Sequence, residues 1–244
     1  MDRRLNEDGT SRDYFYRKKV VVYQHKEGYR FSVDAPILAD FLPHCPEAGA
    51  LEIGTGCGIV SLLALYRNKF PSVEGIEIQE RLCRLARLNA EQNGFPQRFK
   101  VRQADFKDVY RSYRDVPLIF SNPPFRKLSM GRLSPTEEIR LAKSEEKMTV
   151  EDLLLRSFSI LAAKGSLLLI LPSPRYKKIM TLGRSIGYFV SKFRNVFSFR
   201  DGNPERFLVQ FTNHNTVSEE LKPLVIFEKP GVYSEEMEHI FSGS

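Results

Sequence analysis

The stretch LEIGTGCGIVSLLA, residues 51–64, sets Gly54, Gly56 and Gly58 between a short apolar strand and an apolar helix. Glycines let a backbone turn tightly and approach a ligand closely, and the start of a helix presents free N–H groups. The spacing is GxGxG, which differs from the GxGxxG of dinucleotide sites and from the GxxxxGKS/T of nucleoside triphosphate sites. The stretch therefore predicts a nucleotide-type cofactor at a strand–loop–helix junction, with a tight structural turn as the alternative.

Acidic residues lie at the ends of this strand and of the next two predicted strands. Glu52 precedes the first glycine, where a buried carboxylate would repel a pyrophosphate but suit a cationic, amine-bearing ligand. Glu77 closes the second strand, at the offset where an acidic residue accepts hydrogen bonds from a ribose diol. Asp105 follows the third strand and could accept from an adenine amino group, with Phe106 beside the ring. Together these positions predict one crevice at the carboxyl edge of a sheet.

The stretch IFSNPPFRK, residues 119–127, ends a fourth apolar strand on Asn122-Pro123-Pro124-Phe125. Prolines cannot donate to a sheet ladder, so the strand stops here, and the rigid tetrapeptide faces the same crevice. The Asn122 carboxamide and the Pro123 carbonyl can accept hydrogen bonds from a planar amine, and Phe125 can stack on its ring. The alternative is a rigid strand-ending turn, which leaves the asparagine and the phenylalanine unexplained.

Short apolar runs alternate with amphipathic segments along the chain from Ala50. After a helix expected at 32–43, we expect strands at 50–53, 72–78, 99–104, 116–121 and 166–172, with helices at 59–68, 80–92, 149–163 and 174–186. This alternation predicts an α/β, doubly wound, mostly parallel sheet. Strand-like runs at 188–199 and 206–214 flank RDGNPE, whose turn residues predict a C-terminal antiparallel hairpin.

In this order, the glycine loop, Glu77, Asp105 and the NPPF tetrapeptide resemble the class I S-adenosylmethionine-dependent methyltransferases, over residues 29–213. Within that class, YRFSVDAPILADF, SNPPF and MGRLSPTEEIRLAKSE resemble the bacterial tRNA(Val) adenine-N6 methyltransferase family. The resemblance implies a seven-stranded, Rossmann-like methyltransferase fold and methylation of an adenine N6 amine beside the anticodon. Phe125 departs from the commoner tyrosine, a form shared with some rRNA methyltransferases, which leaves the RNA target open.

The predicted site has an acceptor part and a cofactor part. The expected catalytic residues, which hold the amine, are Asn122, Pro123, Pro124 and Phe125. The expected S-adenosylmethionine-binding residues are Glu52, Gly54, Thr55, Gly56, Gly58, Glu77, Ile78, Asp105, Phe106 and Asn122. Three alternatives remain open: guanine-N2 in rRNA as the acceptor, a release-factor glutamine as the acceptor, and a non-catalytic RNA-binding protein on the same fold.

The net charge is +7, from 37 Lys and Arg against 30 Asp and Glu, and the basic residues are unevenly spread. Basic clusters fit a polyanion such as RNA, so we expect RNA to bind around Arg126–Lys147 and around Arg175–Arg206, the alternative being an ordinary solvated surface. The expected organisation is a basic N-terminal arm (1–28), a methyltransferase domain (29–213) and an acidic, peripheral C-terminal tail (214–244).

The sequence also predicts a reduced, cytoplasmic protein without a metal site. Cys45, Cys57 and Cys83 form no CxxC or Cys/His pair, which argues against a disulfide framework or a zinc site. The N-terminal segment carries charges where a signal peptide needs an apolar region, and no apolar run is long enough to span a membrane.

Overall fold

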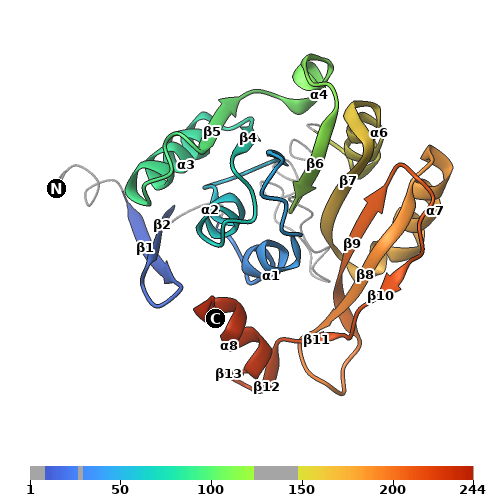
Figure 1. The fold of residues 1–244 in the computed structure, drawn as a ribbon. Helices are drawn as coiled ribbons and strands as arrows, with labels where there is room; N and C mark the ends of the chain where they lie inside the picture. Colours follow the sequence, from blue (N-terminus) through green and yellow to red (C-terminus); the bar gives the residue numbers. More distant parts are fainter. Residues whose placement is uncertain (1–8, 27–29, 124–147, 244) are drawn as a thin grey trace, which may run out of the picture.

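The computed structural model, which describes residues 9–26, 30–123 and 148–243, has a central twisted sheet with helices on both faces (Figure 1). The strands follow the order β10-β8-β9-β7-β6-β3-β4-β5, and β11 also pairs with β8. Their bounds are β3 Ala50–Ile53, β4 Val73–Glu77, β5 Phe99–Gln103, β6 Val116–Ser121, β7 Leu161–Pro172, β8 Phe189–Phe197, β9 Pro204–Thr212, β10 Glu219–Glu220 and β11 Leu224–Val225.

The prediction of a doubly wound, mostly parallel sheet is confirmed. Neighbours from β5 through β4, β3 and β6 to β7 are parallel, whereas β9 is antiparallel to both β7 and β8. These are the seven expected strands, with the expected hairpin at the end. Two short parallel additions, β10 and β11, widen the sheet beyond the prediction.

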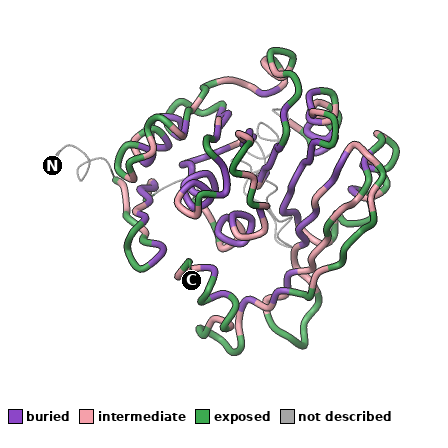
Figure 2. The backbone as a smooth tube through the Cα atoms, in the orientation of Figure 1, coloured by how far each residue is buried: buried purple, intermediate pink, exposed green. Residues whose placement is uncertain are grey.

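Successive side chains of a strand point to opposite faces of the sheet, so the strands contribute to two apolar cores, one on each face. Leu118 and Phe120 of β6 lie in the first core, and Ile119 between them lies in the second. The helices and short 3₁₀ turns are α1 Asp34–Phe41, α2 Ile59–Tyr66, α3 Glu80–Gln92, α4 Phe106–Val109, η2 Tyr110–Ser112, α6 Val150–Ile160, η3 Ser173–Arg175, α7 Tyr176–Ile186 and α8 Glu235–Ser242. Residues of α1, α2, α3 and α8 build the first core, and those of α4, α6 and α7 the second, so the middle strands are buried on both faces (Figure 2).

Local sequence signals explain several helix ends. Thr149 and Asp152 form a capping box at the start of α6, and Ser32 accepts a hydrogen bond from the Asp34 amide just before α1, with Pro36 in the first turn. The expected helix 149–163 ends earlier than predicted, at Ile160, because β7 begins at Leu161 rather than at residue 166.

The predicted N-terminal arm differs from the structure over residues 10–25. These residues form an antiparallel hairpin, β1 Thr10–Phe15 and β2 Val20–His25, whose Val20 and Val22 are fully buried in the first core. The Asn89 side chain of α3 accepts from the Tyr23 amide and donates to the Tyr23 and Cys57 carbonyls, which ties the hairpin to the glycine loop. The polar strand β1 has no apolar run, so its pairing with β2 left no strong signal in the sequence.

The C-terminal tail is also more closely integrated than a peripheral segment. Besides β10 and β11, it forms a small antiparallel pair, β12 Phe227–Lys229 and β13 Val232–Tyr233, and it contributes Met237 and Ile240 of α8 to the first core. Its acidic residues meet basic residues of β8: Glu219 lies 3.5 Å from Lys192, and Glu236 forms an ion pair with Arg194. The tail therefore neutralises part of the basic cluster that the sequence predicts between Arg175 and Arg206.

Candidate active site at the carboxyl edge of the sheet

The glycine loop and the strand ends around it form the centre of the candidate site. β3 lies between β4 and β6, so the chain winds outward in both directions from β3. Parallel sheets bind ligands at such a switch point, outside the carboxyl ends of the strands. The loop after β3, the residues that close β4, and Asn122 after β6 all lie at this edge.

Gly54 gives the loop an open surface. Its φ of 71° is in the left-handed region that favours glycine, and a Cβ built on it meets no atom within 4 Å. Gly58 also has a positive φ, of 85°, but a Cβ there would lie 2.5 Å from the Phe99 ring. Gly54 therefore leaves room for a ligand, whereas Gly58 lets α2 pack closely against β5.

Glu52 and Thr55, both predicted to bind the cofactor, contact each other beneath the loop surface. Glu52 is 2 % exposed, and its Oε2 accepts hydrogen bonds from Thr55 Oγ1 at 2.6 Å and from Ser61 Oγ. Burial raises the pKa of Glu52 to about 7, against the two hydroxyl bonds, which lower it. The carboxyl group thus braces the loop from beneath.

The raised pKa of Glu52 makes stability depend on pH. The native state holds a proton on Glu52 that the unfolded chain releases near pH 4.5, so the free energy of unfolding falls as the pH rises through 4.5 to 7. Glutamine does not titrate, so Glu52→Gln lacks this loss. Between pH 4.5 and 8 we expect the free energy of unfolding of the variant to rise by up to about 3 kcal/mol relative to that of the wild type. Urea unfolding of the cofactor-free protein across this range measures the difference. Glu47→Gln, at an exposed position, is the control, and parallel pH profiles for wild type and Glu52→Gln would contradict the prediction.

Glu77 links the end of β4 to the glycine loop. Its Oε2 accepts from the Gly56 amide at 3.0 Å, and its Oε1 accepts from the Gln79 amide at 2.9 Å. A carboxylate has about four lone-pair sites, so both oxygens keep acceptor capacity for further donors such as ribose hydroxyls. Ile78 next to it is 37 % exposed, which leaves an apolar surface beside the carboxylate.

Asp105 and Phe106 are neighbours in the sequence, but Asp105 lies at the edge of the sheet and Phe106 lies in the core. Asp105 caps α4 by accepting from the Lys107 amide at 2.9 Å, and it stays partly exposed at the edge. Phe106 is 3 % exposed in the second core, and its ring centroid lies 6.2 Å from that of Tyr110. The structure therefore gives Phe106 a packing role and leaves little ring surface for the expected contact with an adenine.

Asn122 is half-buried at the end of β6, and Pro123 is buried beside it. The preceding residue, Ser121, donates from Oγ to the Ile53 carbonyl at 2.6 Å, so the end of β6 is joined to the last residue of β3. This bond holds Asn122 next to the start of the glycine loop. Pro124, Phe125 and the predicted basic segment Arg126–Lys147 lie outside the described residues.

Sequence reasoning missed the two serines that hold the site together. Ser61 is the one buried polar residue in the apolar helix IVSLLALY, and Ser121 ends the apolar strand VPLIFS. An isolated hydroxyl on an apolar element near a predicted site is the available signal, because a buried polar group requires a hydrogen-bond partner.

Two classes of site have no candidate in the described part of the chain. No group of three or more His, Cys, Asp or Glu side chains is arranged there to hold a metal ion. None of the helices in residues 9–26, 30–123 and 148–243 has the length and apolar character needed to cross a membrane.

Comparison with known proteins identifies the family. Residues 30–188 match the family model of the methyltransferase small domain. A Porphyromonas gingivalis W83 protein named tRNA1(Val) (adenine(37)-N6)-methyltransferase is 30 % identical over 200 residues, covering 79 % of this chain and 76 % of that protein. A protein of the same name from Flavobacteriaceae bacterium strain 3519-10 is 26 % identical, over 91 % of this chain and 94 % of that one.

Solved structures support the fold. A crystal structure of a predicted O-methyltransferase, Atu636 from Agrobacterium tumefaciens, superposes with a TM-score of 0.66 at 18 % identity and covers 86 % of this chain and 95 % of that one. At this identity the similarity shows the Rossmann-like methyltransferase fold alone.

Proposed function

Because the chain belongs to the methyltransferase small-domain family, we propose that it transfers a methyl group to the exocyclic N6 amine of an adenine in tRNA, beside the anticodon. S-adenosylmethionine is the methyl donor, and when bound it supplies a methyl group on a positively charged sulfonium. The acceptor assignment draws on the names of the relatives and on the NPPF tetrapeptide. The observation that carries the proposal is the Ser121–Ile53 hydrogen bond, which joins the acceptor strand end to the cofactor loop.

The residues at the carboxyl edge fit the donor. Gly54 leaves open space at the loop surface, Glu77 offers two oxygens to ribose hydroxyls, and Ile78 offers an apolar surface to an adenine ring. Glu77 gives the site negative character, which suits a ligand with a cationic sulfonium and an amine. In this proposal Asp105 accepts from the adenine amino group of the donor.

Asn122 and Pro123 hold and orient the acceptor amine. We assign to the Asn122 carboxamide oxygen and the Pro123 carbonyl the role of accepting the two amine hydrogens, which turns the nitrogen lone pair toward the methyl group. Accepting both hydrogens also draws electron density onto the nitrogen and favours a more tetrahedral geometry. The amine proton becomes acidic only after the methyl group has bonded, so the step needs no strong base from the protein. Pro124 and Phe125 are proposed to stiffen this arrangement and to stack on the flipped base.

The test of the proposed function is product identification. The protein is incubated with labelled S-adenosylmethionine and in vitro transcribed tRNA(Val), and the digested RNA is analysed for methylated nucleosides. We expect N6-methyladenosine, and no label in a matched transcript with guanine at tRNA position 37. In parallel reactions with rRNA and a release factor, label found only as methylguanosine or only in protein would refute the proposal. A tRNA substrate also implies action in the cytoplasm.

A further inference from the structure

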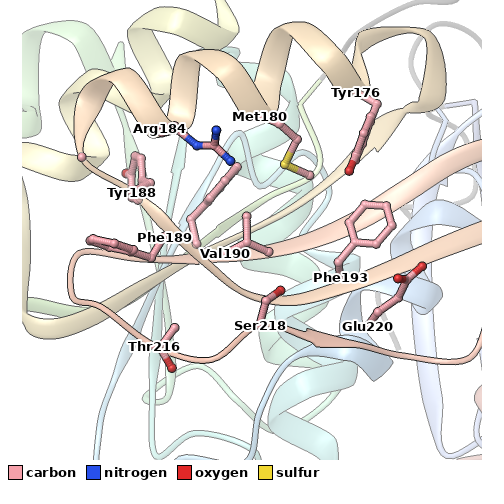
Figure 3. A pocket seen from close by; sticks show the side chains of 12 residues that line it. Tyr176, Met180, Arg184, Tyr188, Phe189, Val190, Phe193, Thr216, Ser218 and Glu220 are labelled. Carbon is pink, nitrogen blue, oxygen red and sulfur yellow. The ribbon is translucent and has the colours of Figure 1, made fainter.

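A second concave site lies away from the glycine loop, at the far edge of the sheet. It is a cavity of about 590 Å³ between helix α7, strand β8 and the segment 216–220 (Figure 3). Tyr176, Met180 and Arg184 project from the helix, Val190 and Phe193 form the floor, and Ser218 and Glu220 line the opposite wall. None of these residues belongs to the candidate active site.

The cavity exposes aromatic rings. Tyr176 and Phe189 are each 42 % exposed, and Tyr176 packs edge-on against Phe193 with a centroid distance of 5.3 Å. Burying large apolar side chains is favourable, so partly exposed rings in a concave surface are typical of a binding site. Rings held in this way offer flat faces on which a nucleobase can stack.

The charge of α7 favours an anionic partner. The helix carries Lys177, Lys178 and Arg184 and no acidic residue. Arg184 extends into the cavity (Figure 3), and within the described residues none of these three cations forms an ion pair. By contrast, Lys192 and Arg194 on the neighbouring strand are paired with acids of the tail. The helix α7 therefore offers three cations of the predicted basic cluster to a polyanion.

The polar groups complete the chemistry of a nucleotide site. Ser218 and Glu220 line the wall opposite α7, and Thr216 adds a further hydroxyl at the edge of the cavity, where Figure 3 shows it turned away from the helix. Hydroxyls can bond to ribose or to base edges, and a carboxylate can accept from the amino group of a base. The aromatic rings therefore suit a base, the Arg184 guanidinium suits a phosphate, and the hydroxyls suit a sugar.

We propose that this cavity binds a nucleotide of the substrate RNA that flanks the methylated adenine, an inference that rests on the proposed function. The Tyr176 end of the cavity lies toward the carboxyl edge at which Asn122 lies, because β7 is the neighbour of β6 and Tyr176 follows the end of β7 through η3. The other end, at Phe189 and Val190, lies toward the amino edge, because β8 runs parallel to β7 and begins there. Across the sheet, β8 is three strands from β6, which corresponds to about 15 Å. A few nucleotides of single-stranded RNA span this lateral distance, so one strand can reach both Asn122 and the Tyr176 end of the cavity.

The test compares three variants of the full-length protein in binding and activity assays. Arg184→Gln removes the cation in the cavity, and Lys178→Gln, on the same helix but outside the cavity lining, is the charge-matched control. Tyr176→Leu removes the stacking ring but keeps an apolar side chain over Phe207, and thermal unfolding checks that it folds. The measurements are the Kd for tRNA as a function of salt, the Kd for S-adenosylmethionine, and the KM and kcat with tRNA.

We expect Tyr176→Leu to raise the Kd and KM for tRNA about 5- to 100-fold with unchanged affinity for S-adenosylmethionine, because base stacking contributes about 1–3 kcal/mol. Arg184→Gln should reduce the slope of log Kd against log salt by about 0.7, as for one lost phosphate contact on a single strand, and Lys178→Gln should not. Equal slopes for the two charge variants, or an unchanged Kd in Tyr176→Leu, overturn the inference. The proposed function fails separately, when the wild type forms no N6-methyladenosine in tRNA.

Discussion

Asn122→Ala is expected to lower kcat for methyl transfer by about 10²–10³-fold, the usual effect of removing one well-placed polar group from an active site. The side chain stands at the end of β6, which Ser121 joins to the last residue of β3, so its carboxamide is held beside the glycine loop. Losing it leaves the acceptor amine without one of its two hydrogen-bond acceptors. The affinity for S-adenosylmethionine should change little, and this separates an acceptor residue from a cofactor residue.

The conservative variant Asn122→Asp serves as the matched control. Aspartate keeps an acceptor oxygen in the same position, so we expect it to retain more activity than alanine. Single-turnover rates and isothermal titration with S-adenosylmethionine measure the two quantities independently. If Asn122→Ala lost cofactor binding and methyl transfer to the same extent, Asn122 would belong to the cofactor site instead.

Glu77→Gln is expected to raise the Kd for S-adenosylmethionine about 100-fold. In the structure both carboxylate oxygens already accept backbone N–H bonds, from Gly56 and Gln79. A glutamine has a single acceptor oxygen, so it cannot keep both bonds and also accept from a ribose. Each lost bond to a charged acceptor costs about 1.5–3 kcal/mol, and one fully lost ribose bond plus a displaced loop accounts for the expected change.

The control for Glu77 is on the same strand. Glu74→Gln removes a carboxylate at the other end of β4, where it accepts from the Tyr113 hydroxyl, away from the carboxyl edge. Isothermal titration of both variants, at a temperature where thermal unfolding shows each to be folded, compares their cofactor affinities. Similar affinities for the two variants would show that Glu77 has no contact with the cofactor.

Much of the fold could be predicted because its signals are local. The apolar runs of β3 and β6 and the amphipathic pattern of α3 occur at the predicted residues, and turn residues predicted the hairpin between β8 and β9. The N-terminal hairpin escaped prediction because β1 is polar, and the packing of the tail escaped because acidic composition says nothing about the partners of the acids. Phe106 was predicted to lie beside a ligand because it follows Asp105 in the sequence, but its ring is buried in the second core.

The sequence by itself determined the class of the fold, the family and the order of the site along the chain. Strands that alternate with helices must run parallel, and their carboxyl ends then meet at one edge, so a glycine loop, Glu77, Asp105 and Asn122 converge without further information. The tertiary structure alone decided which polar atoms meet. The bonds from Asn89 to Tyr23 and from Ser121 to Ile53 join residues 66 and 68 positions apart. The cavity beside α7 likewise needs three separate segments. Such contacts depend on the packing of distant elements and follow no periodic pattern, which is why no stretch of sequence contains them.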